Sequence, residues 1–153
     1  MSGGVPPAPG RVLGLDLGDA RIGVAVSDDE RRVAVPLGTV RTGAPHDLKA
    51  IAALVRDNAV SLVVVGHPRA MSGRSGARAQ GAEEFAGALG AFVGVPVVLQ
   101  DERLTTQEAD RKLRATGARG TERRRKIDQA AATVILQAWL DANEGGSNRE
   151  TPR

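Results

Sequence analysis

Carboxylate residues stand at three places where the surrounding sequence is apolar. Asp16 interrupts the segment VLGLDL, and Asp128 lies inside the segment IDQAAATVILQAWL. Asp101 and Glu102 directly follow the apolar segment VPVVLQ. A carboxylate in an apolar setting is costly unless a positive charge or several hydrogen-bond donors meet it. The partners of these four acids therefore decide what chemistry this sequence can perform.

Each acid also has a simple structural explanation. Asp16 could accept hydrogen bonds from the turn that follows it. Asp101 and Glu102 could cap a helix that begins near Thr105. Asp128 could be a first-turn acid that the helix dipole favours.

A shared cation is the alternative if the acids converge on one cleft, because three or four neighbouring carboxylates repel one another as anions. The chain has no cysteine and only two histidines, which disfavours a zinc site. Oxygen ligands of this kind hold Mg²⁺ or Mn²⁺. The sequence therefore predicts a magnesium or manganese site, provided that the fold brings the acids together.

The hydrophobic pattern predicts three strands followed by alternating helices and strands. The first three strands have short connections, which indicates antiparallel hairpins. We expect a mixed five-stranded sheet, with three antiparallel strands and then two parallel ones, and helices on both faces. The predicted strands are 11–18, 21–28, 33–40, 60–66 and 95–100, and the predicted helices are 46–58, 77–92, 105–114 and 127–140.

In such a sheet, functional sites gather at the carboxyl ends of the parallel strands. The strand that carries Asp16 and the strand before Asp101 are separated by one strand at most, and the last helix packs across them. We expect one domain over residues 11–142. Composition predicts disordered tails at residues 1–10 and 143–153.

A basic segment points to a phosphate-bearing partner. Residues 111–126 hold eight basic residues and one acid, Glu122, although the net charge of the whole chain is only +3. A concentrated basic segment on a net acidic body favours phosphate binding; the alternative is a solvated loop without a specific partner. Aromatic residues make up 2% of the chain, which disfavours proteins that stack single-stranded bases. Contact with nucleic acid would therefore run through the phosphate backbone.

Other function classes are disfavoured by the motifs. Gly18 and Gly23 have P-loop spacing, but Val24 and Ala25 follow where a lysine and a serine or threonine are required. No GxGxxG opens a helix, and no apolar run approaches the roughly 20 residues that span a membrane. The first ten residues do not read as a signal peptide, so we expect a cytoplasmic protein.

Four segments together resemble the YqgF (RuvX) family of bacterial proteins, described as pre-16S ribosomal RNA nucleases and Holliday-junction-resolvase-like proteins. The segments are GLDLGDARIGVAVSD, VVVGHP, DERLTT and IDQAAATVILQAWL. The resemblance implies a ribonuclease H-like fold and a hydrolase, a metal-dependent nuclease. It implies Asp16, Glu102 and Asp128 as catalytic metal ligands, with Asp101 as a weaker fourth.

The resemblance specifies the substrate contacts less well than the metal ligands, because the sequence departs from the family at two positions. Ala20 stands where the family usually has a basic residue, and Ser72 stands where the family favours Asp or Asn. Arg21 could instead anchor Asp16 or Asp28, and Arg78 could be a solvated helix residue. His67 could contact substrate or be incidental. The predicted nucleic-acid contacts are Arg21, Arg69, Arg74, Arg78, Arg103, Arg119, Arg123, Arg124, Arg125 and Lys126.

Three functions follow as hypotheses. The first is a Mg²⁺- or Mn²⁺-dependent nuclease for structured nucleic acid, with maturation of the 5′ end of pre-16S rRNA favoured and branched DNA as the competing substrate. The second is nucleotide binding, since the first motif is also similar to the phosphate hairpin of actin-like and sugar-kinase ATPases, which need two such domains. The third is a non-catalytic module that binds RNA or ribosomal particles. A monomer and a homodimer both remain open.

Overall fold

The structure of the chain is a computed structural model, and it describes residues 10–67, 75–101 and 120–150. Five strands form one sheet in the order β3-β2-β1-β4-β5. The strands are β1 (Arg11–Leu17), β2 (Arg21–Ser27), β3 (Ala34–Arg41), β4 (Val60–His67) and β5 (Val97–Asp101). The helices are α1 (His46–Asp57), α2 (Ser75–Val93) and α4 (Gly120–Glu150).

The strand directions confirm the predicted mixed sheet. β1 pairs antiparallel with β2, and β2 pairs antiparallel with β3, through the short connections that the sequence contains. β1 pairs parallel with β4, and β4 pairs parallel with β5. The carboxyl ends of β1, β4 and β5 therefore meet at one edge of the sheet, which we call the carboxyl edge.

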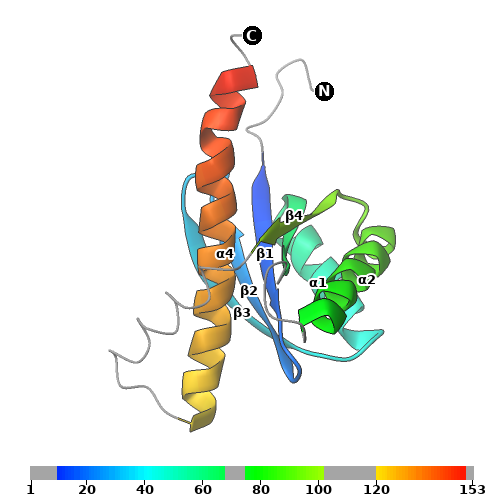
Figure 1. Ribbon diagram of the computed structural model, residues 1–153. Helices are drawn as coiled ribbons and strands as arrows, with labels where there is room; N and C mark the ends of the chain where they lie inside the picture. The colour runs from blue at the N-terminus through cyan, green and yellow to red at the C-terminus, as the bar shows by residue number, and fades with distance from the viewer. Residues whose placement is uncertain (1–9, 68–74, 102–119, 151–153) are drawn as a thin grey trace.

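Helices cover both faces of the sheet (Figure 1). One face packs Leu13 and Leu15 of β1 against α1 and α2, in a core that includes Ile51 and Leu89. On the other face α4 lies across the sheet. Val12 and Ala25 belong to the core on the α4 face. Alternate residues of each strand thus enter different cores, as the two-residue period of a strand requires.

α4 is longer than the helix predicted over 127–140. It includes residues 120–126, which we expected to be part of a basic loop, and residues 143–150, which we expected to be a disordered tail. The basic residues that suggested a loop are good helix formers, and no proline stands between residues 120 and 150. The Gly145–Gly146 pair costs about 1 kcal/mol per residue relative to alanine, but it does not end a helix that is already propagating.

The aromatic residues follow the prediction in part. We expected Phe85, Phe92 and Trp139 in the core. Phe85 and Trp139 are partly buried against the two cores, whereas the side chain of Phe92 is 46% exposed. The prediction was wrong for Phe92, because Leu89 and Val93 are the residues that the end of α2 turns toward the core, and Phe92 lies on the outer side of the helix. None of the helices among the described residues is both long and apolar enough to cross a membrane.

Arg31 contacts three separate segments at the edge of the sheet opposite the carboxyl edge. Its Nε donates to the carbonyl oxygen of Gly10, and its Nη2 donates to Oγ of Ser61, both at 2.9 Å. The guanidinium carbon lies 6.0 Å from the centroid of the Trp139 ring, within reach of a cation–π interaction. The backbone of Arg31 is left-handed, with φ of 61°. These contacts maintain a conformation that a non-glycine residue rarely adopts.

We expect Arg31→Ala to lower the free energy of unfolding by about 1–2 kcal/mol, because it removes two hydrogen bonds from a charged, partly buried donor. Urea titration followed by circular dichroism would measure the change. Arg32→Ala is the matched control. Arg32 is paired with Glu30 at an exposed position, so its loss should cost little. Equal losses for the two variants would contradict this account of Arg31.

Candidate active site at the carboxyl edge of the sheet

The side chain of Asp16 belongs to the face of the sheet that α4 covers. Val12 contributes to the core on the α4 face, Leu13 and Leu15 contribute to the core on the other face, and Gly14 lies against Leu136 of α4. Successive residues of a strand point to opposite faces. Asp16, two residues after Gly14, therefore points toward α4.

Gly23 brings Asp128 to the same place. It is the cross-strand partner of Asp16 on β2. A methyl carbon built on Gly23 would overlap the backbone carbonyl of Asp128, so the helix backbone rests directly on this glycine. Glycine is the residue that permits such a close approach between a helix and a strand. Asp16 and Asp128, 112 positions apart in the sequence, are thus neighbours across Gly23.

Asp128 is partly buried and is paired with the guanidinium of Arg21. Arg21 Nε donates to Asp128 Oδ2 at 3.3 Å, and the two side chains are 22% and 24% exposed. Burial raises the pKa of Asp128, and the hydrogen bond and positive charge of Arg21 offset that rise only in part. The ionised carboxylate is therefore under-compensated, as expected of a group that receives a further cation.

The helix dipole does not account for Asp128. α4 begins at Gly120, so Asp128 lies more than two turns inside the helix. The dipole acts within the first turn. The first-turn explanation that the sequence allowed is therefore wrong.

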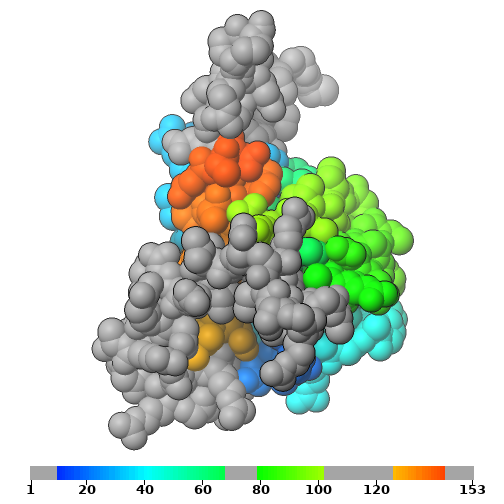
Figure 2. All heavy atoms as spheres, in the orientation of Figure 1, coloured from blue at the N-terminus to red at the C-terminus, as the bar shows by residue number. Residues whose placement is uncertain are grey.

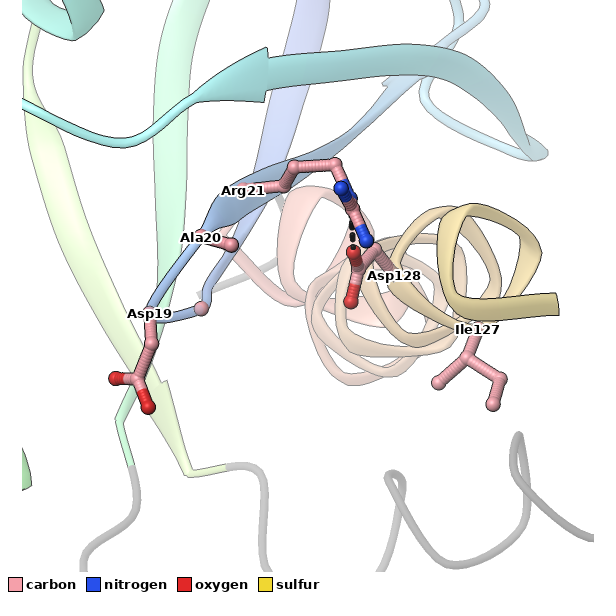
Figure 3. Close-up of a pocket in the computed structure, with 6 residues that line it drawn as sticks. Asp19, Ala20, Arg21, Ile127 and Asp128 are labelled. Atoms are coloured by element: carbon pink, nitrogen blue, oxygen red, sulfur yellow. Dashed lines mark hydrogen bonds and ion pairs between the residues drawn. The ribbon is translucent and has the colours of Figure 1, made fainter. Parts of the chain in front are cut away.

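An open pocket of about 190 Å³ lies beside the ion pair. It is lined by the turn after β1, by Arg21, and by Ile127 and Asp128 of α4. In Figure 3, Arg21 reaches toward Asp128, whereas the carboxylate of Asp19 points away from that pair. The early part of α4 and the β1–β2 region lie side by side on the surface in Figure 2. The pocket is therefore formed by the same two segments that position Asp16 and Asp128.

The segment after β3 braces the turn that lines the pocket. The backbone N–H of Thr42 donates to the carbonyl oxygen of Ala20 at 3.0 Å, and Thr42 Oγ1 donates to that of Gly18 at 2.9 Å. Asp47, in the first turn of α1, accepts from the backbone N–H of Gly43 at 3.0 Å. This hydrogen bonding fixes the turn between the two strands that carry Asp16 and Arg21.

Asp101 is at the carboxyl edge but on the other face. Val98 contributes to the core on the α4 face, while Val97 and Leu99 contribute to the core on the face of α1 and α2. By this alternation Asp101 points to the α1 and α2 face. Among the described residues no three acids or histidines are grouped as a metal site would require. The structure thus brings together Asp16 and Asp128 but not Asp101.

His67 has a structural partner. It is paired in register with Asp101, is only 4% exposed, and its Nε2 lies 2.9 Å from Oε2 of Glu83 on α2. This places His67 between β4 and α2, on the face that does not carry Asp16.

The predicted basic contacts are only partly described. Arg21 lines the pocket, and Lys126 is exposed on α4 shortly before Asp128. Arg78 lies in α2, and Arg123, Arg124 and Arg125 lie in the first turns of α4. The predicted basic contacts that lie outside the described part of the chain are Arg69, Arg74, Arg103 and Arg119. The predicted metal ligand Glu102 also lies outside it.

The sequence interpretation missed the role of Gly23. It considered this glycine only as part of a P-loop spacing. A glycine inside a strand of branched residues, as in RIGVAV, is itself a signal of close approach by another backbone. That signal could have indicated where the last helix lies.

Comparison with known proteins identifies the family of this chain. Residues 10–142 match the model of the RuvX family, described as a Holliday junction resolvase. The chain belongs to the RuvX family. A protein of Anaeromyxobacter sp. (strain Fw109-5), named "Putative pre-16S rRNA nuclease", is 51% identical to this RuvX chain over 132 residues, which cover 86% of the chain and 96% of the relative. A protein of the same name from Mycobacterium tuberculosis (strain ATCC 25618 / H37Rv) is 50% identical over 137 residues, covering 88% and 81%.

Among solved structures, this RuvX chain is similar to RuvC of T. thermophilus in complex with a Holliday junction substrate. The TM-score is 0.56 at 19% sequence identity, and the match covers 88% of this chain and 96% of that one. A likeness at this identity concerns the fold. This chain therefore has the ribonuclease H-like fold that the sequence resemblance implied.

Proposed function

We propose that this RuvX protein is a divalent-metal-dependent nuclease that hydrolyses phosphodiester bonds of structured nucleic acid. The observation that carries the proposal is the convergence of Asp16 and Asp128 across Gly23 at the carboxyl edge of the sheet. Functional sites of such sheets lie at this edge. The family description and the names of the relatives support the same class of activity.

The residues present fit a Mg²⁺ or Mn²⁺ site. Asp16 and Asp128 offer carboxylate oxygens, the ligands that these ions prefer. Burial raises the pKa of Asp128, so a cation beside it would offset a charge that Arg21 alone does not balance. Asp16 and Asp128 would therefore hold the ion.

Glu102 is the best candidate for the third ligand. Asp101 points to the α1 and α2 face by the alternation of β5, and adjacent residues of an extended chain point to opposite faces. The alternation therefore favours the next residue in the sequence over Asp101 itself. Glu102 lies outside the described residues, so this assignment rests on the strand that precedes it.

The bound ion would supply an activated water and would stabilise charge on the phosphate. The chain's own part is to hold Asp16 on a central strand and Asp128 on a helix that cannot shift without displacing Gly23. Rigid placement of this kind lowers the cost of assembling the reacting groups. The pocket beside Arg21 leaves the ion pair open to a phosphate from solvent.

Basic residues near the start of α4 would bind the nucleic-acid backbone. Arg123, Arg124, Arg125 and Lys126 follow one another in the first turns of this helix. Arg123 lies in the first turn of α4, where a cation opposes the helix dipole at a cost of about 0.3–1 kcal/mol. Nearby phosphates would offset that cost. Binding should therefore weaken steeply as salt concentration rises.

The favoured substrate is precursor 16S rRNA, because the relatives are named for a nuclease of that RNA. Action at its 5′ end is the expectation from the sequence resemblance. Branched DNA is the second candidate, because the family description names the Holliday junction.

Metal removal tests the proposal. We expect the wild-type protein to cleave end-labelled precursor rRNA or a four-way DNA junction in Mn²⁺ or Mg²⁺, and to lose that cleavage in EDTA, because the carboxylates act through the ion. Denaturing gels would follow both substrates, and the better-cut one identifies the physiological class. Cleavage that persists in EDTA would exclude the metal-dependent mechanism. Binding of either substrate without cleavage in any metal would favour the non-catalytic module.

A further inference from the structure

Arg21 donates to one of the two carboxylate oxygens through which Asp128 would hold a metal ion. Its Nε donates to Oδ2 of Asp128 at 3.3 Å, and Asp128 is the carboxylate that lies beside Asp16 across Gly23. A cation that takes this carboxylate must share or replace the guanidinium. The ion pair therefore affects the metal affinity of Asp128 as well as the stability of the fold.

Arg21 is also placed to meet a phosphate. It lines the pocket together with Asp128, and its side chain is partly exposed. A guanidinium presents five donors in a planar fork that matches carboxylate and phosphate oxygens. Released from Asp128, the same group could bind a phosphate at the wall of the pocket without a change of backbone.

We propose that Arg21 is a positioning residue that exchanges partners during the reaction. In the metal-free protein, Arg21 holds Asp128 beside the pocket. When Asp128 turns to a divalent cation, Arg21 moves to a phosphate of the bound nucleic acid. The exchange couples metal binding to substrate binding, and it rests on the proposed function, since it requires Asp128 to be a metal ligand.

Arg41 provides a matched control on the neighbouring strand. It is the cross-strand partner of Arg21 in the β2–β3 register, so the two side chains lie on the same face. Arg41 is exposed, and it forms no ion pair with an acid in the part of the chain that the structure describes. Arg21→Gln and Arg41→Gln therefore remove the same charge at neighbouring positions, but only the first removes a partner of Asp128.

The first measurement is the Mn²⁺ affinity of the full chain without nucleic acid, by isothermal titration calorimetry. We expect Arg21→Gln to tighten Mn²⁺ binding by up to about fivefold more than Arg41→Gln does, the factor that corresponds to the strongest ion pairs at exposed positions. Arg21→Lys, which keeps a cation beside Asp128, should bind Mn²⁺ much as the wild type does.

Equal changes in Arg21→Gln and Arg41→Gln would overturn the exchange, because they would reflect only the general loss of positive charge. Weaker Mn²⁺ binding in Arg21→Gln would overturn it as well, since Arg21 would then support the ion rather than compete with it. Absence of Mn²⁺ binding to the wild type would overturn the metal-dependent function itself. The two failures are therefore distinguishable.

The second measurement is the affinity for a labelled four-way junction and for precursor rRNA, in Ca²⁺ and in EDTA. Ca²⁺ takes oxygen ligands as Mg²⁺ does. By linkage, an ion that frees Arg21 should strengthen nucleic-acid binding in the wild type, and this gain should be largely lost in Arg21→Gln but retained in Arg41→Gln. If Ca²⁺ strengthened nucleic-acid binding equally in all three proteins, the proposal that the released Arg21 binds a phosphate would be overturned.

Discussion

Asp16→Asn is expected to lose at least about 100-fold in cleavage rate, the upper end of what mutations in the outer shell of a metal site already cost. Asp16 lies on the central strand and points to the face where Asp128 meets Gly23. The substitution replaces a carboxylate ligand by a neutral amide of the same shape. We expect the stability of the fold to be unchanged or higher, because one of two neighbouring negative charges is removed. Single-turnover cleavage and thermal melting of the same preparation measure both effects.

Asp29→Asn is the control for this prediction. Asp29 lies beyond the end of β2, at the opposite edge of the sheet, and is paired with Arg11 at an exposed position. It should change neither cleavage nor melting. Asp101→Asn should lose far less activity than Asp16→Asn, because its side chain belongs to the other face. An Asp16→Asn protein that unfolds, or one that still cleaves at the wild-type rate, would argue against the metal pair.

Gly23→Ala is expected to destabilise the protein by about 3 kcal/mol, the upper end for an added group in a packed interior. The added methyl would overlap the backbone carbonyl of Asp128, and backbone atoms cannot move aside as a flexible side chain can. For a chain of this size the loss corresponds to a melting temperature lower by roughly 6–12 °C. Mn²⁺ affinity should fall as well, because α4 must shift and carry Asp128 with it.

Gly87→Ala is the matched control for Gly23. A methyl group on Gly87, in α2, would meet no atom within 4 Å. Alanine in a helix interior is favoured over glycine by about 0.5–1 kcal/mol, so this variant should melt at a slightly higher temperature. If Gly23→Ala melted like Gly87→Ala, α4 would not rest on Gly23 in solution.

The strand pattern could be predicted from the sequence because its causes are local. The apolar run around Asp16 and the branched run VSLVVVG each fill a strand that is buried on both faces, and both were placed within one or two residues. The short connections determined the antiparallel direction of the first three strands. The convergence of Asp16 with the last helix followed from topology, since only one strand separates β1 from β5.

The remaining features depend on contacts between distant residues. The sequence alone did not distinguish Asp101 from Glu102 as a metal ligand. The choice depends on which face of the sheet each side chain points to, and this is known only because Val97 and Leu99 pack in one core and Val98 in the other. The ion pair of Arg21 with Asp128 spans 107 positions, and the sequence suggested Asp16 or Asp28 instead. The bounds of α4 were missed because dense positive charge was taken as a loop signal.

The contact of α4 with Gly23 also sets an order of events during synthesis. Asp16 emerges early from the ribosome, and its strand can pair with β2 and β3 soon afterwards through local hairpins. Asp128 arrives only with α4, the last element that the structure describes. A nascent chain without α4 holds only half of the carboxylate pair. If this pair holds the metal ion as proposed, cleavage activity would arise only after translation has delivered and packed this helix.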